Sequence, residues 1–364
     1  MRRDSRFHIA VIPGDGIGPE IVGSCLQVLD VLHERLGGIG FNFRRLEGGA
    51  AHFQQTGCAF SEESMAECRK ADAVLVGAIG LPDVRYPDGT EVSTHFDLRV
   101  KMDLYAGLRP IRSYPALRRV LTDKRAGMID LVLVREQTEG LLYSHGRGTM
   151  EEDQVAWETM RISREGSRRV SEFAFWLAER RAKSRRRPGK VTCVDKANVL
   201  SSMAFFRKVF AEVAARYPDI KAEYAYVDST AMHLVKAAWE FDVLVTENAF
   251  GGILSDLSAG LVGSLGLAPS ADIGDKHAVF QPAHGSAPDI AGQGIANPIA
   301  QILSAALMLD WLADQHAEPR LAHGARILEH AVEKALTLIC PIEFGGEDGT
   351  AAITKAIMAQ IRKA

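Results

Sequence analysis

The chain has 364 residues, of which 47% are hydrophobic and 24% charged, and its formal net charge at pH 7 is −3. This length suits two domains or one large α/β unit of an ordinary globular protein, and so weak a charge gives no reason to expect a nucleic acid or an anionic membrane as partner. Five scattered cysteines without metal-ligand spacing, and apolar runs well short of the ~20 residues of a membrane span, predict a reduced cytoplasmic protein.

Short apolar runs alternate with helical patterns along the chain. Five runs are continuous and rich in β-branched residues, which predicts strands buried on both faces: 8–12, 73–79, 130–134, 190–194 and 242–246. Apolar residues at helical spacing occupy 170–177, and another helical pattern begins at Pro298. This alternation predicts an α/β fold with a largely parallel sheet. Residues 146–157 are polar and poorly periodic, which indicates an extended arm.

The segment IPGDGIGPEI (12–21) follows the first predicted strand and opens a helix. It does not complete the dinucleotide fingerprint G-x-G-x-x-G, because the third glycine would fall at Pro19. We therefore interpret it as a tight strand-to-helix turn, with Pro19 and Glu20 starting the helix.

Arginines stand in otherwise apolar surroundings between residues 96 and 112. Arg99, Arg109 and Arg112 form either structural ion pairs with Asp97 and Asp103 or a site for carboxylate ligands, which the guanidinium fork binds well. Arg135 directly follows another predicted strand, and ligand groups gather at the carboxyl ends of strands in α/β proteins. Together the arginines predict a small substrate with more than one carboxylate.

Three further candidates lie at strand ends. Lys196 follows the strand at 190–194 and is either a surface residue or a general base. Asp228 lies between a short strand and a helix, where N-capping is the default interpretation. In VTENAFGGILSD (245–256), Gly251 and Gly252 stand where a helix should begin, with Asp256 one turn later. This stretch is either a metal and substrate site or a glycine-rich helix start.

A long loop rich in Gly, Ala and Pro covers residues 281–298 and contains His284, Ser286, Asp289 and Asn297. Small residues let a ligand approach the backbone, and an acid beside them can bind the hydroxyls of an adenosine ribose. The loop is therefore too long and too specific to be only a turn.

These segments, in this order, resemble the β-decarboxylating dehydrogenases, which act on 3-isopropylmalate, isocitrate, homoisocitrate, tartrate and D-malate. The resemblance covers nearly the whole chain and is carried by LRVKMDLYAGLRP, VREQTEG, VDKANVL, YVD, NAFGGILSD and HGSAPDIAGQGIANP. It implies a two-domain isopropylmalate/isocitrate dehydrogenase-like α/β fold that is not a true Rossmann fold. A discontinuous large cofactor-binding domain would take 1–105 and 262–364. A small dimerisation domain would take 106–261, with an arm around 145–160 that interlocks with the partner of a homodimer.

The resemblance also implies a reaction, namely NAD-dependent oxidation and β-decarboxylation of a 3-substituted (2R)-malate, assisted by Mg²⁺ or Mn²⁺. Arg99, Arg109 and Arg135 would bind the carboxylates of a dicarboxylate or tricarboxylate substrate. Lys196 and Asp228 would act from the partner subunit, Tyr143 would serve as the acid, and Asp228 and Asp256 would bind the metal. Six residues of the loop would hold NAD: His284, Gly285, Ser286, Ala287, Asp289 and Asn297.

The chain departs from the family pattern at several functional positions. Gly252 stands in place of a metal-binding Asp, Gln281 in place of an acid, and Gly107 in place of an Asn. Leu142 occupies the slot of the family's tyrosine, and Tyr143 follows it. His95 and Phe96 replace the paired leucines that pack against isopropyl groups, which keeps a tartrate or D-malate dehydrogenase open beside a 3-isopropylmalate enzyme. A catalytically weakened paralogue with a binding or regulatory role is the alternative outside enzyme chemistry.

Overall fold

A computed structural model describes residues 5–364, whose strands form one continuous ten-stranded sheet and one separate hairpin. The order across the sheet is β2 (Ile39–Arg45), β1 (Ser5–Gly14), β3 (Ala73–Ala78), β12 (Ala278–Pro282), β11 (Pro269–Ile273), β4 (Ala106–Arg112), β5 (Asp130–Glu136), β10 (Val243–Thr246), β8 (Lys190–Asp195) and β9 (Lys221–Tyr226). The pairings β12–β11, β11–β4 and β4–β5 in the middle are antiparallel, whereas the outer pairings are parallel.

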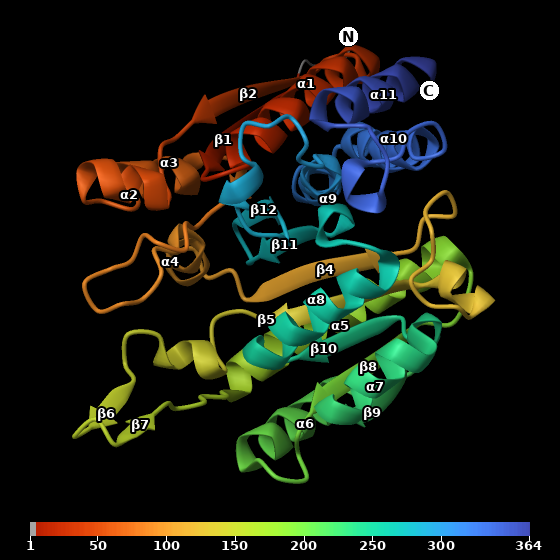
Figure 1. Cartoon of the computed structure of the whole chain (residues 1–364). Helices are drawn as coiled ribbons and strands as arrows, with labels where there is room; N and C mark the ends of the chain where they lie inside the picture. The colour runs from red at the N-terminus through yellow and green to blue at the C-terminus, as the bar shows by residue number, and fades with distance from the viewer. Residues whose placement is uncertain (1–4) are drawn as a thin grey trace.

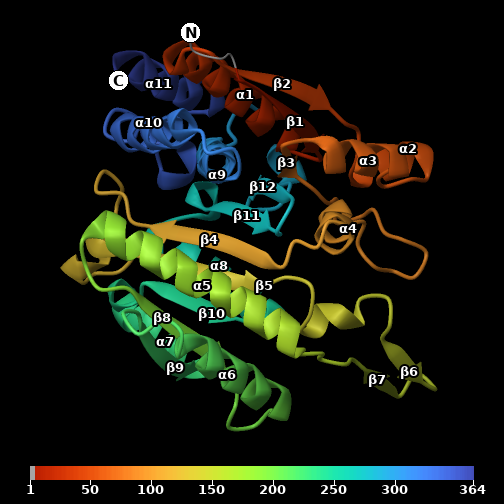
Figure 2. The ribbon, with the colours of Figure 1, turned by 180° about the vertical axis from the view of Figure 1, so that it is seen from behind.

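Helices flank both halves of this sheet (Figures 1 and 2). In the upper half of Figure 1, the sheet carries α1 (Gly18–Leu36), α2 (Ala50–Thr56), α3 (Glu62–Lys70), α4 (Thr94–Lys101), α9 (Ile299–Gln315), α10 (Pro319–Ala335) and α11 (Thr350–Lys363). In the lower half, α7 (Val227–Ala237) and α8 (Asn248–Val262) cover one face, and α5 (Arg164–Arg185) and α6 (Ser201–Ala214) cover the other. A sheet covered on both faces explains why its central strands are apolar throughout.

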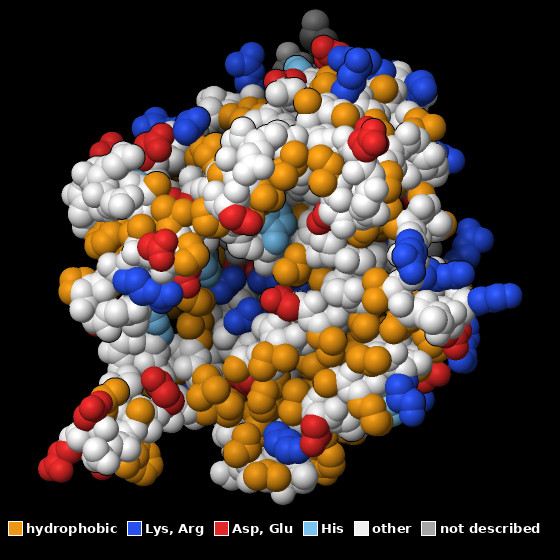
Figure 3. All heavy atoms as spheres, viewed as in Figure 1, with side chains coloured by type: hydrophobic (Ala, Val, Ile, Leu, Met, Phe, Trp, Pro, Cys, Tyr) orange, Lys and Arg blue, Asp and Glu red, His pale blue; other side chains and the backbone are white. Residues whose placement is uncertain are grey.

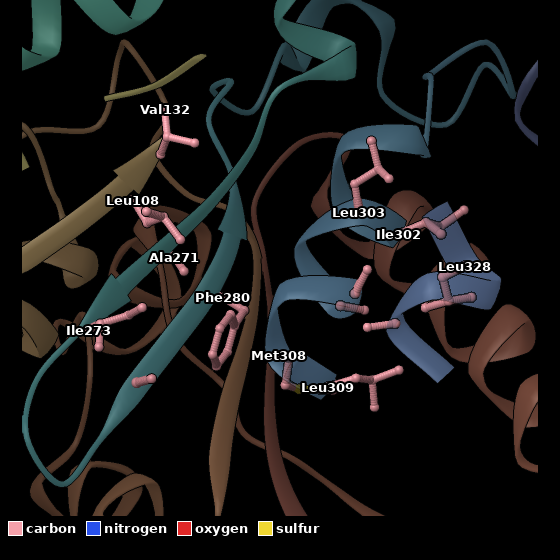
Figure 4. Packing of buried hydrophobic residues seen from close by; sticks show 14 of the residues in the cluster. Leu108, Val132, Ala271, Ile273, Phe280, Ile302, Leu303, Met308, Leu309 and Leu328 are labelled. Carbon is pink, nitrogen blue, oxygen red and sulfur yellow. The ribbon is translucent and has the colours of Figure 1, made fainter. Parts of the chain in front are cut away.

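The largest hydrophobic cluster joins the central strands to α9 and α10 (Figure 4). Phe280 of β12 points toward α9, where Met308 and Leu309 are fully buried, and Leu328 of α10 packs behind them. Each such side chain contributes about 1.5–3 kcal/mol when it leaves water. This packing fixes β11 and β12, the strands that precede the long loop.

The predicted α/β fold with a largely parallel sheet is confirmed. All five apolar runs are strands, namely β1, β3, β5, β8 and β10, and the helical spacing at 170–177 lies within α5. The helix expected from Pro298 is α9, for which Pro298 is the N-cap. None of the helices in residues 5–364 has the length and apolar character that a membrane crossing requires.

Apart from the two strands of the separate hairpin, the strands of residues 106–261 form one half of the sheet, and those of 5–105 and 262–364 form the other. The halves meet where β4 pairs with β11. The division into two domains at these boundaries stays a prediction. Within the expected arm, β6 (Thr149–Glu151) and β7 (Val155–Trp157) form an exposed hairpin that stands away from the body in both views.

The turn after β1 is built around Asp15, whose side chain is buried. Its carboxylate accepts hydrogen bonds from the backbone N–H groups of Ala50, Ala51 and Gly80 at 2.8–2.9 Å. Gly14 has φ +76°, and a Cβ there would lie 2.1 Å from the carbonyl oxygen of Ala78. These contacts give IPGDGIGPEI a structural role as the tight strand-to-helix turn expected from its sequence.

Candidate active site

A cavity of about 270 Å³ lies between the two halves of the sheet. Figure 3 shows it as a hollow in the middle of this face, with Lys/Arg, His and acidic side chains around it. Its lining comes from α4, α8, the middle of β4, the ends of β3, β5 and β12, and the loop after β12. The lining residues are Gly77, Ile79, His95, Phe96, Arg99, Arg109, Arg135, Gly252, Ser255, Asp256, Gln281, Pro282, Ala283, His284 and Gly285.

Arg99 of α4 and Arg109 of β4 share one buried carboxylate, that of Asp272 on β11. Arg99 Nε lies 2.7 Å from Asp272 Oδ2, and Arg109 Nη1 lies 3.1 Å from Asp272 Oδ1. Burial alone would raise the pKa of Asp272, but the two guanidiniums hold that pKa below its ordinary value. The alternative in which these arginines pair with Asp97 and Asp103 is therefore wrong, and Arg112, the third candidate, pairs with Glu333 instead. The acid that binds Arg99 and Arg109 is more than 160 residues away in the chain.

Arg135, near the end of β5, reaches the same cavity without a carboxylate partner among the described residues. Its Nη2 donates to Asn248 Oδ1 at 2.8 Å, whereas its buried Nε has no hydrogen-bond partner there. Burial and the charges of Arg99 and Arg109 lower the pKa of Arg135 to about 9. An arginine in such surroundings favours an anionic ligand.

Asp256 faces the cavity from α8. The helix begins at Asn248, earlier than the two glycines suggested, and Glu247 caps it by accepting from the N–H groups of Ala249 and Phe250. A Cβ at Gly252 would lie 3.3 Å from Arg135 Nη1, so a small side chain there would lie beside that guanidinium. The stretch is therefore both a helix start and a wall of the cavity.

His95 and Phe96 line the cavity next to Arg99, whose guanidinium carbon lies 5.4 Å from the centre of the Phe96 ring. Burial and the positive charge of Arg99 lower the pKa of His95 to about 3, so its imidazole is neutral at pH 7. This part of the cavity therefore presents aromatic and uncharged polar surface.

Lys196 and Asp228 lie together, but away from the cavity. Lys196 Nζ donates to Asp228 Oδ2 at 2.5 Å, and neither residue belongs to the lining. The ammonium, together with the N–H of Ser229, lowers the pKa of Asp228. The default N-cap interpretation of Asp228 is wrong, because Tyr226 is the N-cap of α7 and Asp228 lies in its first turn.

Tyr143 lies in a short 3-10 helix, η2 (Leu141–Ser144), between two other arginines. The guanidinium carbons of Arg147 and Arg161 lie 4.4 Å and 5.2 Å from the centre of its ring. Neither Tyr143 nor Leu142 is among the residues that line the arginine cavity. The role of Tyr143 as the acid stays a prediction.

The loop after β12 packs on the turn of Asp15. Ser286 is buried, with its carbonyl oxygen accepting from Ile17 N–H at 2.8 Å and its hydroxyl donating to the carbonyl oxygen of Gly80. His284 and Gly285 reach the cavity. Burial lowers the pKa of His284, and its Nδ1 lies 2.9 Å from the carbonyl oxygen of Gly285.

The remaining loop residues lie further from the cavity. Ala287 adopts a left-handed conformation with φ +37°, and Asp289 follows it, exposed on the short 3-10 helix η5 (Pro288–Ile290). Asn297 is buried, where its Nδ2 donates to Glu343 Oε1 and its Oδ1 accepts from Ile299 N–H at 3.0 Å. The loop thus leads from the cavity to an exposed carboxylate.

The sequence interpretation missed two residues, Asp272 and Gln137. The side chain of Gln137 donates to Asp272 Oδ1, and a Cβ at Gly107 would lie 2.4 Å from its Nε2. Gln137 therefore fills the space that a side chain at Gly107 would occupy. The available signal for Asp272 was an acid within the short apolar segment PSADI. An acid that is buried in a strand is expected to have a charged partner, because acids are rarely buried unless they are paired.

A family model described as Isocitrate/isopropylmalate dehydrogenase matches residues 8–357. A 3-isopropylmalate dehydrogenase from Aquifex aeolicus is 43% identical over 338 residues, which cover 91% of this chain and 89% of that protein. A 3-isopropylmalate/3-methylmalate dehydrogenase from Methanocaldococcus jannaschii is 41% identical over 357 residues, which cover 98% of this chain and 99% of that protein.

Solved structures agree with these relatives. An isocitrate dehydrogenase from Methylococcus capsulatus superposes with a TM-score of 0.85 at 34% identity, covering 98% of this chain and 99% of that one. A β-decarboxylating dehydrogenase from Thermococcus kodakarensis gives a TM-score of 0.77 at 36% identity, covering 98% and 96%. From its sequence and its fold, the chain belongs to the isocitrate/isopropylmalate dehydrogenase family.

Proposed function

We propose that the protein is an NAD-dependent dehydrogenase that oxidises and β-decarboxylates a 3-substituted (2R)-malate. The observation that carries this proposal is the convergence of Arg99, Arg109 and Arg135 with Asp256 on one cavity. Such a cavity suits a small acid with several carboxylates. The names of the relatives support the same class, since those proteins act on 3-isopropylmalate or 3-methylmalate.

In this proposal the guanidiniums hold the substrate carboxylates and orient the 2-hydroxyl. Arg135 makes the strongest contact, because it has no carboxylate partner among the described residues. Lys196 of the partner subunit takes the hydroxyl proton as general base. Within one subunit, Lys196 and Asp228 lie outside the cavity lining, which supports a site completed by a second copy.

Exposed apolar side chains support the homodimer. Met232 and Val235 on α7, Ile253 on α8, and Val199 and Leu200 before α6 are all exposed. Figure 3 shows apolar side chains gathered over this lower part of the face, below the arginine cavity. An apolar area of this kind commonly marks a subunit interface. In the proposed dimer the Lys196 end of one subunit would lie near the cavity of the other.

The residues present fit a divalent metal. Asp256 offers one carboxylate to the cavity, and Asp228 of the partner subunit would offer a second. Mg²⁺ commonly uses only one or two protein carboxylates and keeps several waters, so the absence of an acid at Gly252 is compatible with binding. When bound, such an ion acidifies the 2-hydroxyl and stabilises negative charge on the oxygen during decarboxylation.

The loop of residues 284–297 would hold NAD. His284, Gly285 and Ser286 would place the backbone against the cofactor, and Asp289 would accept both hydroxyls of the adenosine ribose. Asp289 is exposed, and its charge would repel a 2′-phosphate. We therefore propose NAD rather than NADP.

A second candidate is a weakened paralogue that binds the ligand without efficient turnover. It is favoured by Gly252 and by the position of Tyr143, which is outside the cavity lining. One assay distinguishes the two candidate functions, namely the measurement of NADH formation with Mn²⁺ and a panel of 3-alkylmalates, D-malate, tartrate and isocitrate. The enzyme is expected to turn over at least one dicarboxylate of the panel. No turnover of any member at millimolar Mn²⁺, with ligand binding retained, would establish the second candidate.

A further inference from the structure

Asp272 accepts hydrogen bonds from four side chains that surround it. Its two carboxylate oxygens accept from Arg99 Nε, Arg109 Nη1, Gln137 Nε2 and Gln281 Nε2, the last at 3.4 Å. Its side chain is 1% exposed. The two guanidiniums hold the pKa of Asp272 below its ordinary value, so the carboxylate is ionised at pH 7.

Asp272 lies behind the wall of the cavity and acts through two residues of that wall. Arg99 and Arg109 line the cavity, and each gives one donor group to Asp272. The three arginines and Asp272 therefore carry a net charge of +2, before the carboxylate of Asp256 in the lining is counted. Without Asp272 the same cluster would attract a ligand carrying one more negative charge.

The rest of the lining offers no further cation. Among residues 5–364, the lining holds Arg99, Arg109 and Arg135 as its only arginines or lysines, and Asp256 adds a negative charge. His95, next to Arg99, is neutral at pH 7. The stretch expected to select the substrate thus presents an imidazole and a phenyl ring, and a third carboxylate would find no unpaired cation there.

We propose that Asp272 is a positioning residue that sets the charge of the accepted ligand, so that the site takes a dicarboxylate with an uncharged substituent and discriminates against a tricarboxylate. This inference rests on the proposed function for the reaction itself, but the charge selection is a property of binding. It can therefore be measured without turnover.

The test compares two unreactive anions that differ by one carboxylate, glutarate and 3-carboxyglutarate (tricarballylate), by calorimetry at pH 7.5 without divalent metal. The wild-type protein is expected to bind glutarate more tightly. In Asp272→Asn, the ratio of the two affinities is expected to move toward the trianion by roughly tenfold, the effect of one unit charge at close range in a partly buried site. A general loosening of the cavity would weaken both ligands alike and leave the ratio unchanged.

The double variant Asp272→Asn/Gln281→Glu is the matched control. Gln281 lies on β12, its side chain already contacts Asp272, and the change moves the carboxylate to the next strand while keeping the charge. Its affinity ratio is expected to return to that of the wild type. An unchanged ratio in Asp272→Asn, or a double variant that behaves like the single one, would overturn the proposal.

Failure of this inference is distinct from failure of the proposed function. The affinity ratio tests Asp272, whereas NADH formation with the panel of 2-hydroxy acids tests the reaction. If the reaction holds, wild-type kcat/KM is expected to be higher for a 3-alkylmalate than for isocitrate, and Asp272→Asn is expected to narrow that difference. A wild-type preference for isocitrate would contradict the inference and leave the dehydrogenase activity established.

Discussion

Two groups of ion-paired side chains contain most of the candidate site residues, and the two groups differ in how deeply they are buried. Arg99 and Arg109 pair with Asp272, and all three side chains are 1–6% exposed. Lys196 and Asp228 pair at 2.5 Å on the outer part of the molecule, with side-chain exposures of 25% and 65%. The buried group is complete within one subunit, because an unpaired charge there would be costly. The exposed pair is easily separated, since water replaces each partner, and this suits residues expected to act on a second subunit.

The largest expected effect on stability concerns the buried group. Asp272→Ala would leave Arg99 and Arg109 buried without their carboxylate and is expected to lower the free energy of unfolding by about 3–5 kcal/mol. Urea denaturation followed by circular dichroism measures this loss. Asp228→Ala is the matched control, and its denaturation midpoint should equal that of the wild type because water solvates the freed Lys196. Equal losses of unfolding free energy in both variants would show that burial does not make the Asp272 group more important for stability than the Lys196–Asp228 pair.

The exposed pair should matter for activity instead. Lys196→Ala is expected to lower kcat by at least about 100-fold, the scale of general-base catalysis, with an unchanged denaturation midpoint. Arg135→Ala should be equally inactive through loss of substrate binding.

Co-expression of the Lys196→Ala and Arg135→Ala subunits tests whether the site is shared. In a randomly assembled dimer population, half of the dimers are mixed and contain one intact site, so about a quarter of the wild-type activity should return. If the co-expressed subunits are as inactive as either single variant, then Lys196 and Arg135 of different subunits do not form one active site.

His95, next to the buried arginines, is expected to make the protein less stable in acid. His95 has a pKa of about 3 in the folded protein and an ordinary value of 6.5 when unfolded, so the unfolded chain binds a proton first as the pH falls. Stability is therefore lost as the pH falls below about 6.5, by about 2 kcal/mol from this residue at pH 5. His95→Asn should flatten the stability profile between pH 6.5 and pH 4. A profile as steep as that of the wild type would contradict a neutral imidazole at His95.

The smallest expected effect is at Gly252. Gly252→Asp would add a carboxylate one helical turn before Asp256 and is expected to tighten Mn²⁺ binding about tenfold, measured by titration of the activity or by calorimetry. The gain is limited because the new side chain would also contact Arg135. Gly252→Asn provides the space-matched control. An unchanged metal requirement in the Asp variant would mean that Asp256 is not at the metal site.

The fully buried strands and several helices followed from local pattern. Buried strands such as β5 and β10 are continuous apolar runs, and α5 shows its apolar face at helical spacing. The antiparallel centre of the sheet did not follow, because β4 and β11 contain charged residues within their strands. A charged residue interrupts the apolar run by which a buried strand is predicted. The residue that pairs with this charge is known only from the tertiary structure.

By itself, the sequence determined the α/β class and the order of the motifs, because strand and helix periods are local properties. It offered four arginines as candidates, and the family resemblance selected Arg99, Arg109 and Arg135, the three that line the cavity. Only the tertiary structure decided which acid neutralises those arginines, since β11 and β4 pair across more than 150 residues of chain. It also decided that Lys196 and Asp228 lie apart from the cavity. Both outcomes depend on contacts between distant segments, where the electrostatic cost of burial selects the partner.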